Sequence, residues 1–333
     1  MKKIGITTTV PTEILIAAGY SVVDLNNSFT GFADPAGLIS DAEKLGFPRN
    51  TCAWIKGIFS ACMKNDIREI VGVVEGDCSN TKALLDVFKA HGVQVTPFVY
   101  PHDRRIESVR ASMTVFMEQF GVTPGQAETV RNRLIPVRSL AKKLDEMTYL
   151  DNKATGFENH LYQISLSDFC SDENECKRML KSKIEEIQKR SPIKDRLRLG
   201  YIGVPPMIPD LYDYLEKAGA RVVYNEMQRE FAFPRAEMAN DIIEQYRDYT
   251  YPYDIDFRLC EIKKQITERK LDSIIHYVQA FCYRAIDDIV IKKSLDLPVL
   301  TIEGDRQNTL DARTKLRIDA FVDMLLDRKE GVS

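Results

Sequence analysis

The sequence repeats itself, and this internal duplication restricts the fold more than any other feature. Residues 67–78 (IREIVGVVEGDC) align without a gap with residues 271–282 (LDSIIHYVQAFC), 204 positions further along the chain. Residues 18–23 (AGYSVV) match residues 218–223 (AGARVV) after 200 positions. The separation between matching residues differs little between the two pairs, and a few small insertions account for the difference. The sequence therefore predicts two halves of similar structure.

Each half alternates short apolar runs, typical of buried strands, with segments of helical periodicity. The expected strands lie at residues 3–6, 21–25, 67–78 and 93–99 in the first half and at 197–202, 221–224, 271–282 and 297–302 in the second. Strands that alternate with helices favour parallel sheets, because a parallel pair needs a crossover connection. The sequence therefore predicts the α/β class.

A chain of 333 residues is long enough for two domains of this kind. We expect a first α/β domain at residues 1–110, a helical bridge or insertion at 111–190, and a second α/β domain at 191–333. The second domain should end in a helix from about Asp311, whose apolar stripe docks on that half.

Composition excludes several classes of protein. The formal net charge is −3, which lacks the basic excess that nucleic-acid binding requires. No apolar run approaches the roughly 18 residues of a membrane span, and the apolar stretch at residues 4–6 is too short for a signal peptide. We therefore expect a cytoplasmic protein that binds neither nucleic acid nor membranes.

The seven cysteines, at positions 52, 62, 78, 170, 176, 260 and 282, are odd in number and widely spaced, so thiols are expected rather than disulfides. Cys78 and Cys282 occupy equivalent positions, each after a predicted strand and before a helix. Ligands bind at the carboxyl ends of parallel strands, where helix N-termini point their amides outward. Such amides stabilise thiolate, the form that binds metals, so both cysteines are predicted metal ligands.

Cys52 is a third candidate, because Pro48 and the capping-type residues Asn50 and Thr51 place it in the first turn of a helix. Cys260 is a weaker candidate, since it aligns one helical turn beyond the Cys52 position. For the three other cysteines we expect simple burial or surface exposure; these are Cys62, Cys170 and Cys176.

Several familiar motifs are missing from the sequence. It has no CxxC pair, which disfavours a zinc ribbon or a ferredoxin-type cluster, and its four histidines have no metal-ligand spacing. It also lacks the GxGxxG, GxxxxGK[ST] and GxSxG motifs, so nucleotide hydrolysis and α/β-hydrolase chemistry are not indicated. Polar residues that follow the strands could contact a ligand or simply cap helices; these are Asn26, Asn27, Glu75, Asp77, Ser79, Asn80, Glu303, Asp305 and Arg306.

Six short segments carry a resemblance to a known family: VPTEI (10–14), AAG (17–19), CAWIKG (52–57), GDCSN (76–80), FCYR (281–284) and EGDR (303–306). In this order they resemble the D-component family of 2-hydroxyacyl-CoA dehydratases. That family also includes benzoyl-CoA reductase subunits and double-cubane cluster proteins. The resemblance covers both halves of the chain.

This resemblance implies two Rossmann-like domains that hold an oxygen-sensitive iron–sulfur cluster in the cleft between them. In the family, three cysteines hold a [4Fe–4S] cluster, and Cys52, Cys78 and Cys282 are the matching positions. It also implies a separate ATP-hydrolysing iron–sulfur activase that delivers one low-potential electron. Members of the family pair into homodimers or heterodimers, and their substrates are acyl-CoA thioesters.

Three hypotheses follow. The first is an activase-driven, low-potential reductase or dehydratase component, acting on an acyl-CoA or a similarly hard-to-reduce small molecule. Within this hypothesis the additional cysteines, notably Cys62 and Cys260, leave open a double-cubane [8Fe–9S] reductase of small molecules. The second is a cluster carrier that binds the cluster and has no substrate of its own. The last is a cofactor-free protein of two domains that binds an anionic small ligand on helix N-termini.

Overall fold

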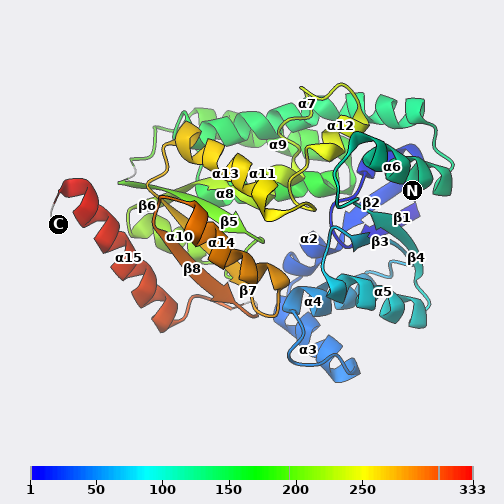
Figure 1. Cartoon of the computed structure of the whole chain (residues 1–333), viewed down its shortest axis with the longest axis horizontal. Coiled ribbons are helices and arrows are strands. Elements are labelled where there is room, and N and C mark those ends of the chain that lie inside the picture. Colours follow the sequence, from blue (N-terminus) through cyan, green and yellow to red (C-terminus); the bar gives the residue numbers. More distant parts are fainter. Residues whose placement is uncertain (1, 195, 307, 332–333) are drawn as a thin grey trace. The chain divides into compact units, whose positions relative to one another are not determined.

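The computed structural model describes residues 2–194, 196–306 and 308–331. It divides into two compact units, each built from three segments of the chain. The first unit comprises Met1–Lys142, Ile164–Lys181 and Glu230–Asp254; the second comprises Lys143–Gln163, Ser182–Arg229 and Ile255–Ser333. Each unit contains one four-stranded sheet with helices around it (Figure 1).

The sheet of the first unit is all-parallel, with the strand order β2-β1-β3-β4. Its strands are β1 (Lys2–Ile6), β2 (Tyr20–Asp24), β3 (Glu69–Glu75) and β4 (Gln94–Val99). The chain builds outward in opposite directions from β1 and β3. The carboxyl ends of these two strands therefore form a topological switch point, the usual ligand position in such sheets.

Helices of the first unit cover this sheet. They are α1 (Thr12–Ala17), α2 (Leu25–Thr30), α3 (Pro35–Leu45), α4 (Ala53–Lys64), α5 (Ser79–Ala90), α6 (Ile106–Gln119), η1 (Ser165–Ser167), η2 (Phe169–Ser171) and α12 (Ile242–Arg247). Helix α5 packs against β3 and β4. Its residues Leu84, Leu85 and Phe88 recur at helical spacing and are buried in the apolar core between helix and sheet.

The second unit repeats this design, with four parallel strands in the order β6-β5-β7-β8. Its strands are β5 (Leu197–Gly203), β6 (Ala220–Asn225), β7 (Ser273–Gln279) and β8 (Val299–Gly304). The strand order is that of the first sheet, so the equivalent switch point lies between β5 and β7. The predicted α/β class, with two similar Rossmann-like halves and parallel sheets, is confirmed.

The helices of the second unit are α10 (Leu211–Lys217), α13 (Ile255–Arg269), η3 (Tyr283–Ile286), α14 (Asp287–Ser294) and α15 (Ala312–Glu330). Asp311 caps α15 by accepting a hydrogen bond from the Thr314 amide at 2.6 Å. Ile318, Val322 and Leu325 of this helix are buried in the core of the unit, as the apolar stripe predicted.

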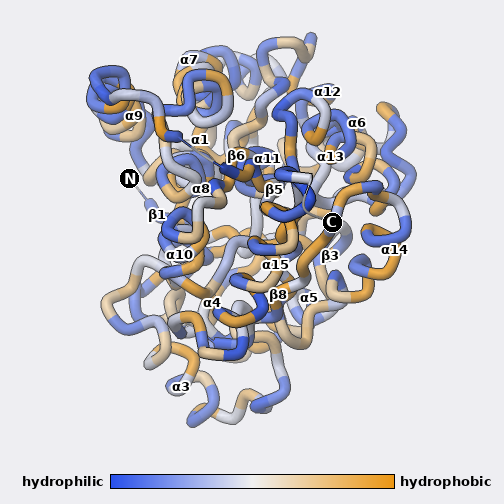
Figure 2. The backbone as a smooth tube through the Cα atoms, turned by 90° about the vertical axis from the view of Figure 1, so that its left-hand side faces the viewer, coloured by the Kyte–Doolittle hydropathy of each residue, from blue (hydrophilic) through white to orange (hydrophobic). Residues whose placement is uncertain are grey.

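Four helices carry the chain from one unit into the other. They are α7 (Pro124–Tyr149), α8 (Gly156–Ile164), α9 (Glu173–Gln188) and α11 (Glu226–Phe231). The segment 111–190 is mostly helical, as predicted, and contributes residues to both units. Hydrophilic positions dominate α9, with apolar ones between them, as Figure 2 shows.

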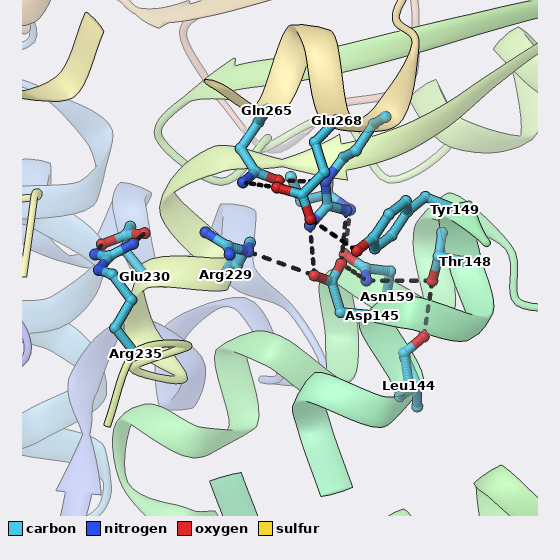
Figure 3. A network of polar contacts seen from close by, with 12 residues as sticks. Leu144, Asp145, Thr148, Tyr149, Asn159, Arg229, Glu230, Arg235, Gln265 and Glu268 are labelled. Carbon is cyan, nitrogen blue, oxygen red and sulfur yellow. Dashed lines mark hydrogen bonds and ion pairs between the residues drawn. The ribbon is translucent and has the colours of Figure 1, made fainter. Parts of the chain in front are cut away.

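Buried ion pairs connect the helices of the second unit. Asp145, near the end of α7, receives two hydrogen bonds from Arg269 at the end of α13. It receives a further one from Asn159 at 2.9 Å (Figure 3). Such charges are retained in a core because each is paired and hydrogen-bonded.

Among the described residues, no helix combines the length and apolar character that crossing a bilayer requires.

Candidate functional site

Cys78 lies at the switch point of the first sheet. Strand β3 ends at Glu75, and Gly76 turns the chain with a φ of +86°, which a side chain would oppose. A Cβ atom on Gly76 would lie 2.7 Å from the Cβ of Tyr100 and 2.9 Å from that of Pro252. The turn delivers Cys78 to the N-cap position of α5, as predicted.

Polar neighbours hold the Cys78 side chain in place. Its sulfur lies 3.4 Å from the hydroxyl of Thr81, which in turn donates a hydrogen bond to Asp77 at 3.0 Å. Burial and the Asp77 carboxylate raise the pKa of Cys78, although Thr81 and the first amides of α5 act in the opposite direction. The amides favour the thiolate, as expected, but burial and Asp77 have the larger effect on the pKa of Cys78. A metal ion that binds the Cys78 sulfur would therefore have to displace the thiol proton.

Cys52 occupies the corresponding N-cap position of α4, directly before the first turn in which its sequence context placed it. It is buried, with 7% of its surface exposed, in an apolar cluster with Ile55 and Phe59. Cys78 packs against this same cluster. The first unit therefore combines two of the three predicted ligands in a weakly hydrated setting.

Cys282 stands at the equivalent switch point of the second sheet. It follows Phe281, whose φ of +64° turns the chain after β7, and it occupies the N-cap position of η3. Its amide donates a hydrogen bond to the carbonyl of Gln279 at 3.0 Å. Cys282 borders a small recess of about 10 Å³, which has room for about one water molecule. It is lined by Gly203, Val204, Met227, Arg258, His276, Tyr277, Val278, Gln279, Arg284 and Ala285.

An ion-pair network lies beside this recess. Arg258 donates two hydrogen bonds to Glu226, at 2.8 and 3.0 Å, and one to Asp287 at 2.8 Å. Its guanidinium is therefore fixed and permanently charged. His276 contacts Asp288 at 2.7 Å, but burial lowers the pKa of His276, which fits its predicted role as a core residue.

The other cysteines occupy different settings. The Cys62 thiol is buried in α4 and donates to the carbonyl of Ile67 at 3.5 Å, and burial raises its pKa to about 12. This fits the expected packing role. Cys260 is exposed on α13 and stays a predicted, weaker ligand candidate. Cys170 and Cys176 belong to the first unit.

Two of the predicted polar contacts have structural roles. The Asn26 side chain donates to Asp24 at 2.8 Å and to the carbonyl of Thr7 at 3.0 Å, and Asn27 donates to Ile164 and Ser167. These bonds fasten α2 to neighbouring segments. Asp77 lies beside a candidate ligand and contacts Cys78 directly, since its carboxylate accepts the Cys78 amide at 2.8 Å.

Sequence reasoning missed Thr81, Arg258 and Glu226. Thr81 stands three residues after the N-cap Cys78, a spacing that could have identified it as a neighbour of the sulfur. Arg258 and Glu226 are 32 positions apart and have no local pattern that would pair them.

No three histidine, cysteine, aspartate or glutamate side chains are grouped as a metal centre within the part of the chain that the structure describes. Cys52 and Cys78 belong to the first unit, and Cys282 belongs to the second. A common cluster on these three thiols therefore stays a prediction.

Comparison with known proteins gives one family. The family model of the 2-hydroxyglutaryl-CoA dehydratase D-component matches residues 7–325, which include the three candidate thiols and every strand of the two sheets except β1. A search of curated proteins gives no match.

Proposed function

This chain belongs to the family of the 2-hydroxyglutaryl-CoA dehydratase D-component, and from that membership we propose that it is an iron–sulfur subunit of an acyl-CoA dehydratase or reductase. In this proposal Cys52, Cys78 and Cys282 together hold a [4Fe–4S] cluster. A separate ATP-hydrolysing activase supplies the electron.

The observation that carries the proposal is the equivalence of Cys78 and Cys282. The two residues occupy N-cap positions after the corresponding strands β3 and β7 of two sheets with the same strand order. Packing alone does not require a thiol at the switch point of both sheets. Cys52 adds a third N-cap thiol, within the apolar cluster that Cys78 also contacts.

The chemistry of these residues suits an iron–sulfur cluster. Thiolates are the ligands that such clusters take, and burial with few hydrogen bonds to sulfur lowers the reduction potential. When bound, the cluster would supply one low-potential electron to the substrate. Burial of Cys52 and partial burial of Cys78 keep water away from their sulfurs.

The chain's own residues orient these thiols. Thr81 hydrogen-bonds to the Cys78 sulfur and is itself held by Asp77, so the Cys78 rotamer is fixed. In the second unit, Arg258 places a fixed positive charge beside the recess that Cys282 borders. Glu226 and Asp287 already balance that charge, so the network fixes the side chains around Cys282.

The missing nucleotide motif supports a separate activase. The sequence contains no GxxxxGK[ST] loop, so the ATP hydrolysis that drives electron delivery would belong to a partner. In the same proposal, this subunit forms a homodimer or pairs with a related subunit, and its substrate is an acyl-CoA thioester.

Iron and sulfide analysis of the full chain, purified and reconstituted without oxygen, tests the cluster. We expect about four irons per chain, or about eight for a double cubane. Cys78→Ser should lose most of this iron. Cys62→Ala is the matched control, because it removes a buried thiol of the same unit that donates to a backbone carbonyl.

An iron content below about three per chain that Cys78→Ser leaves unchanged would refute the proposal. Turnover is tested separately, by adding an activase, ATP and acyl-CoA thioesters to the loaded protein. A loaded protein that shows no turnover would instead be a cluster carrier. A colourless triple variant, Cys52→Ser, Cys78→Ser and Cys282→Ser, that retains affinity for an anionic ligand would favour the cofactor-free binding protein.

A further inference from the structure

A left-handed turn precedes α9 in the first unit. Phe169, Cys170 and Ser171 have φ angles of +52°, +54° and +59°, and all three carry side chains. Residues other than glycine seldom adopt this region, and three in succession persist only where their surroundings hold them. The turn is therefore a strained segment that needs an explanation.

Hydrogen bonds hold this turn against β2. Ser171 donates from its hydroxyl to the carbonyl of Val22 at 2.7 Å, and Ser21 donates to the carbonyl of Ser171 at 3.0 Å. The carboxylate of Asp168 accepts the Cys170 amide at 3.0 Å. These contacts fix the backbone on both sides of Cys170.

The turn places the Cys170 thiol against a second thiol. Cys176 lies in the first turn of α9, where its amide donates to the backbone carbonyl of Asp172 at 3.0 Å. Only 1% of its surface is exposed. The side chains of Cys170 and Cys176 are near enough to interact with each other, and Ser165 interacts with both. Cys170 is partly exposed, so one thiol of the pair is accessible and the other is buried behind it.

We propose that Cys170 and Cys176 form an oxidisable dithiol, a modification site at which a peroxide converts the two thiols into a disulfide. Neither residue belongs to the thiol set of the proposed cluster, so this inference does not depend on it. In proteins of reducing compartments, disulfides are usually transient and redox-sensing, which fits two cysteines six residues apart with one accessible member.

The two thiols have different roles in this reaction. The interaction with Cys176 lowers the pKa of Cys170, whereas the same interaction and burial raise the pKa of Cys176. Asp168, Asp172 and Glu175 are the nearby acidic groups, and they oppose thiolate formation at one or other cysteine. Cys170 is accordingly the thiol that attacks, and Cys176 resolves the product.

The reaction balances with one peroxide. The Cys170 thiolate attacks one oxygen of hydrogen peroxide and breaks the O–O bond, which gives a sulfenic acid and, with a proton, water. The Cys176 sulfur then attacks the sulfenic sulfur, its proton leaves with the hydroxyl as a second water, and the S–S bond forms. The two thiols lose two protons and two electrons, and the peroxide accepts them to become two waters.

Mass spectrometry of the full chain tests this proposal. The tryptic peptide 154–177 contains Cys170 and Cys176 and no other cysteine, with no Lys or Arg between them. After treatment with hydrogen peroxide, alkylation in denaturant and digestion without reduction, we expect this peptide unalkylated and two hydrogens lighter. A thiol reductant should restore both alkylation sites.

Variants separate the two roles. Cys176→Ser should trap Cys170 as a sulfenic acid that reacts with dimedone, and Cys170→Ser should leave Cys176 reduced. Cys260, which is exposed, is the internal control, and Cys170 should react about ten-fold faster than it. The proposal fails if both thiols of peptide 154–177 remain alkylated while Cys260 is oxidised, or if Cys170 pairs with another cysteine. None of these readouts requires bound iron.

Discussion

Arg269 and Asp145 form a buried two-point ion pair that joins the ends of two helices. The Nη1 and Nη2 atoms of Arg269 lie 2.9 and 2.5 Å from the Oδ1 and Oδ2 atoms of Asp145, and both side chains are at most 6% exposed. Arg269 also donates to the carbonyl of Val223 at 2.7 Å at the end of β6. The pair therefore connects α7 and α13 to the second sheet.

Replacing Arg269 by Ala should destabilise the second unit strongly. The change leaves the Asp145 carboxylate buried without its main partner, and breaking a buried pair in this way costs about 3–5 kcal/mol. Urea unfolding followed by circular dichroism measures the loss. Arg196→Ala is the control, because the Arg196–Glu330 pair is about 60% exposed and should contribute at most about 1 kcal/mol. Equal losses for the two variants would contradict this prediction.

Acid should weaken the first unit through Glu13. Burial raises the pKa of Glu13, but Arg138 at 2.8 Å and hydrogen bonds from Tyr246 and Gln245 together hold it below the ordinary value. A carboxyl whose pKa is depressed by folding stabilises the folded state above its unfolded pKa of about 4.3, and that contribution is lost as the pH falls through the folded pKa.

Glu13→Gln should flatten this acid dependence and lower stability at neutral pH, where the buried Arg138 loses its counter-ion. Trp54 is the single tryptophan and lies in α4 of the first unit, so its fluorescence reports urea unfolding there. Midpoints measured from pH 6 to pH 3 test the prediction. An unchanged slope in Glu13→Gln would show that Glu13 is not the group that titrates.

Asp24 and Asp168 should produce the opposite dependence. The carboxylate of Asp168 accepts the Asp24 amide at 2.8 Å, burial raises the pKa of both groups, and the Asp24 charge raises that of Asp168 further. A carboxyl whose pKa is raised by folding stabilises the folded state below its unfolded pKa of about 3.9. Its contribution is lost as the pH rises through the folded pKa.

Asp24→Asn removes one of the two charges. It keeps a side-chain oxygen that can accept the hydrogen bond that the Asn26 amide donates to Asp24 at 2.8 Å. The variant should therefore lose less stability than the natural chain between pH 4 and pH 7, again by Trp54 fluorescence. A steeper loss in Asp24→Asn would contradict the assignment of the raised pKa to this pair.

The fold could be predicted from the sequence because its signals are local and occur twice. The apolar runs predicted the strands of both sheets. Capping-type residues placed Cys52 at a helix start, and the end of a predicted strand placed Cys78 before a helix. The Arg269–Asp145 pair could not be predicted in this way, since its members are 124 positions apart and neither has a distinctive neighbourhood. Such pairs depend on how helices pack, which no local pattern encodes.

The two halves also differ where the sequence suggested similarity. Leu84 and Leu85 of α5 are buried, whereas Ile286 and Ile289 of the corresponding segment are 69% and 72% exposed. The two segments also begin differently, because the 3₁₀ helix η3 precedes α14, whereas α5 begins directly after Cys78. The left-handed turn at residues 169–171 is a similar case, because its residue types give no sign of positive φ angles.

Gly76 should be required for the position of Cys78. A methyl group at this residue would meet the Cβ atoms of Tyr100 and Pro252 at less than 3 Å, at a φ of +86° that costs about 1 kcal/mol or more for other residues. Gly76→Ala should therefore destabilise the first unit by about 2–4 kcal/mol, from backbone strain and overpacking together. It should also lower iron retention, because the backbone that carries Cys78 has to move.

Gly92→Ala is the matched control for this prediction. Gly92 has a similar φ of +78°, but a Cβ atom there would meet no atom within 4 Å, so this substitution should cost only about 1 kcal/mol and leave the iron content unchanged. Urea unfolding by Trp54 fluorescence and iron analysis of both variants separate backbone strain from crowding. If Gly76→Ala and Gly92→Ala had the same stability and the same iron content, crowding at the turn would not determine where the Cys78 sulfur lies.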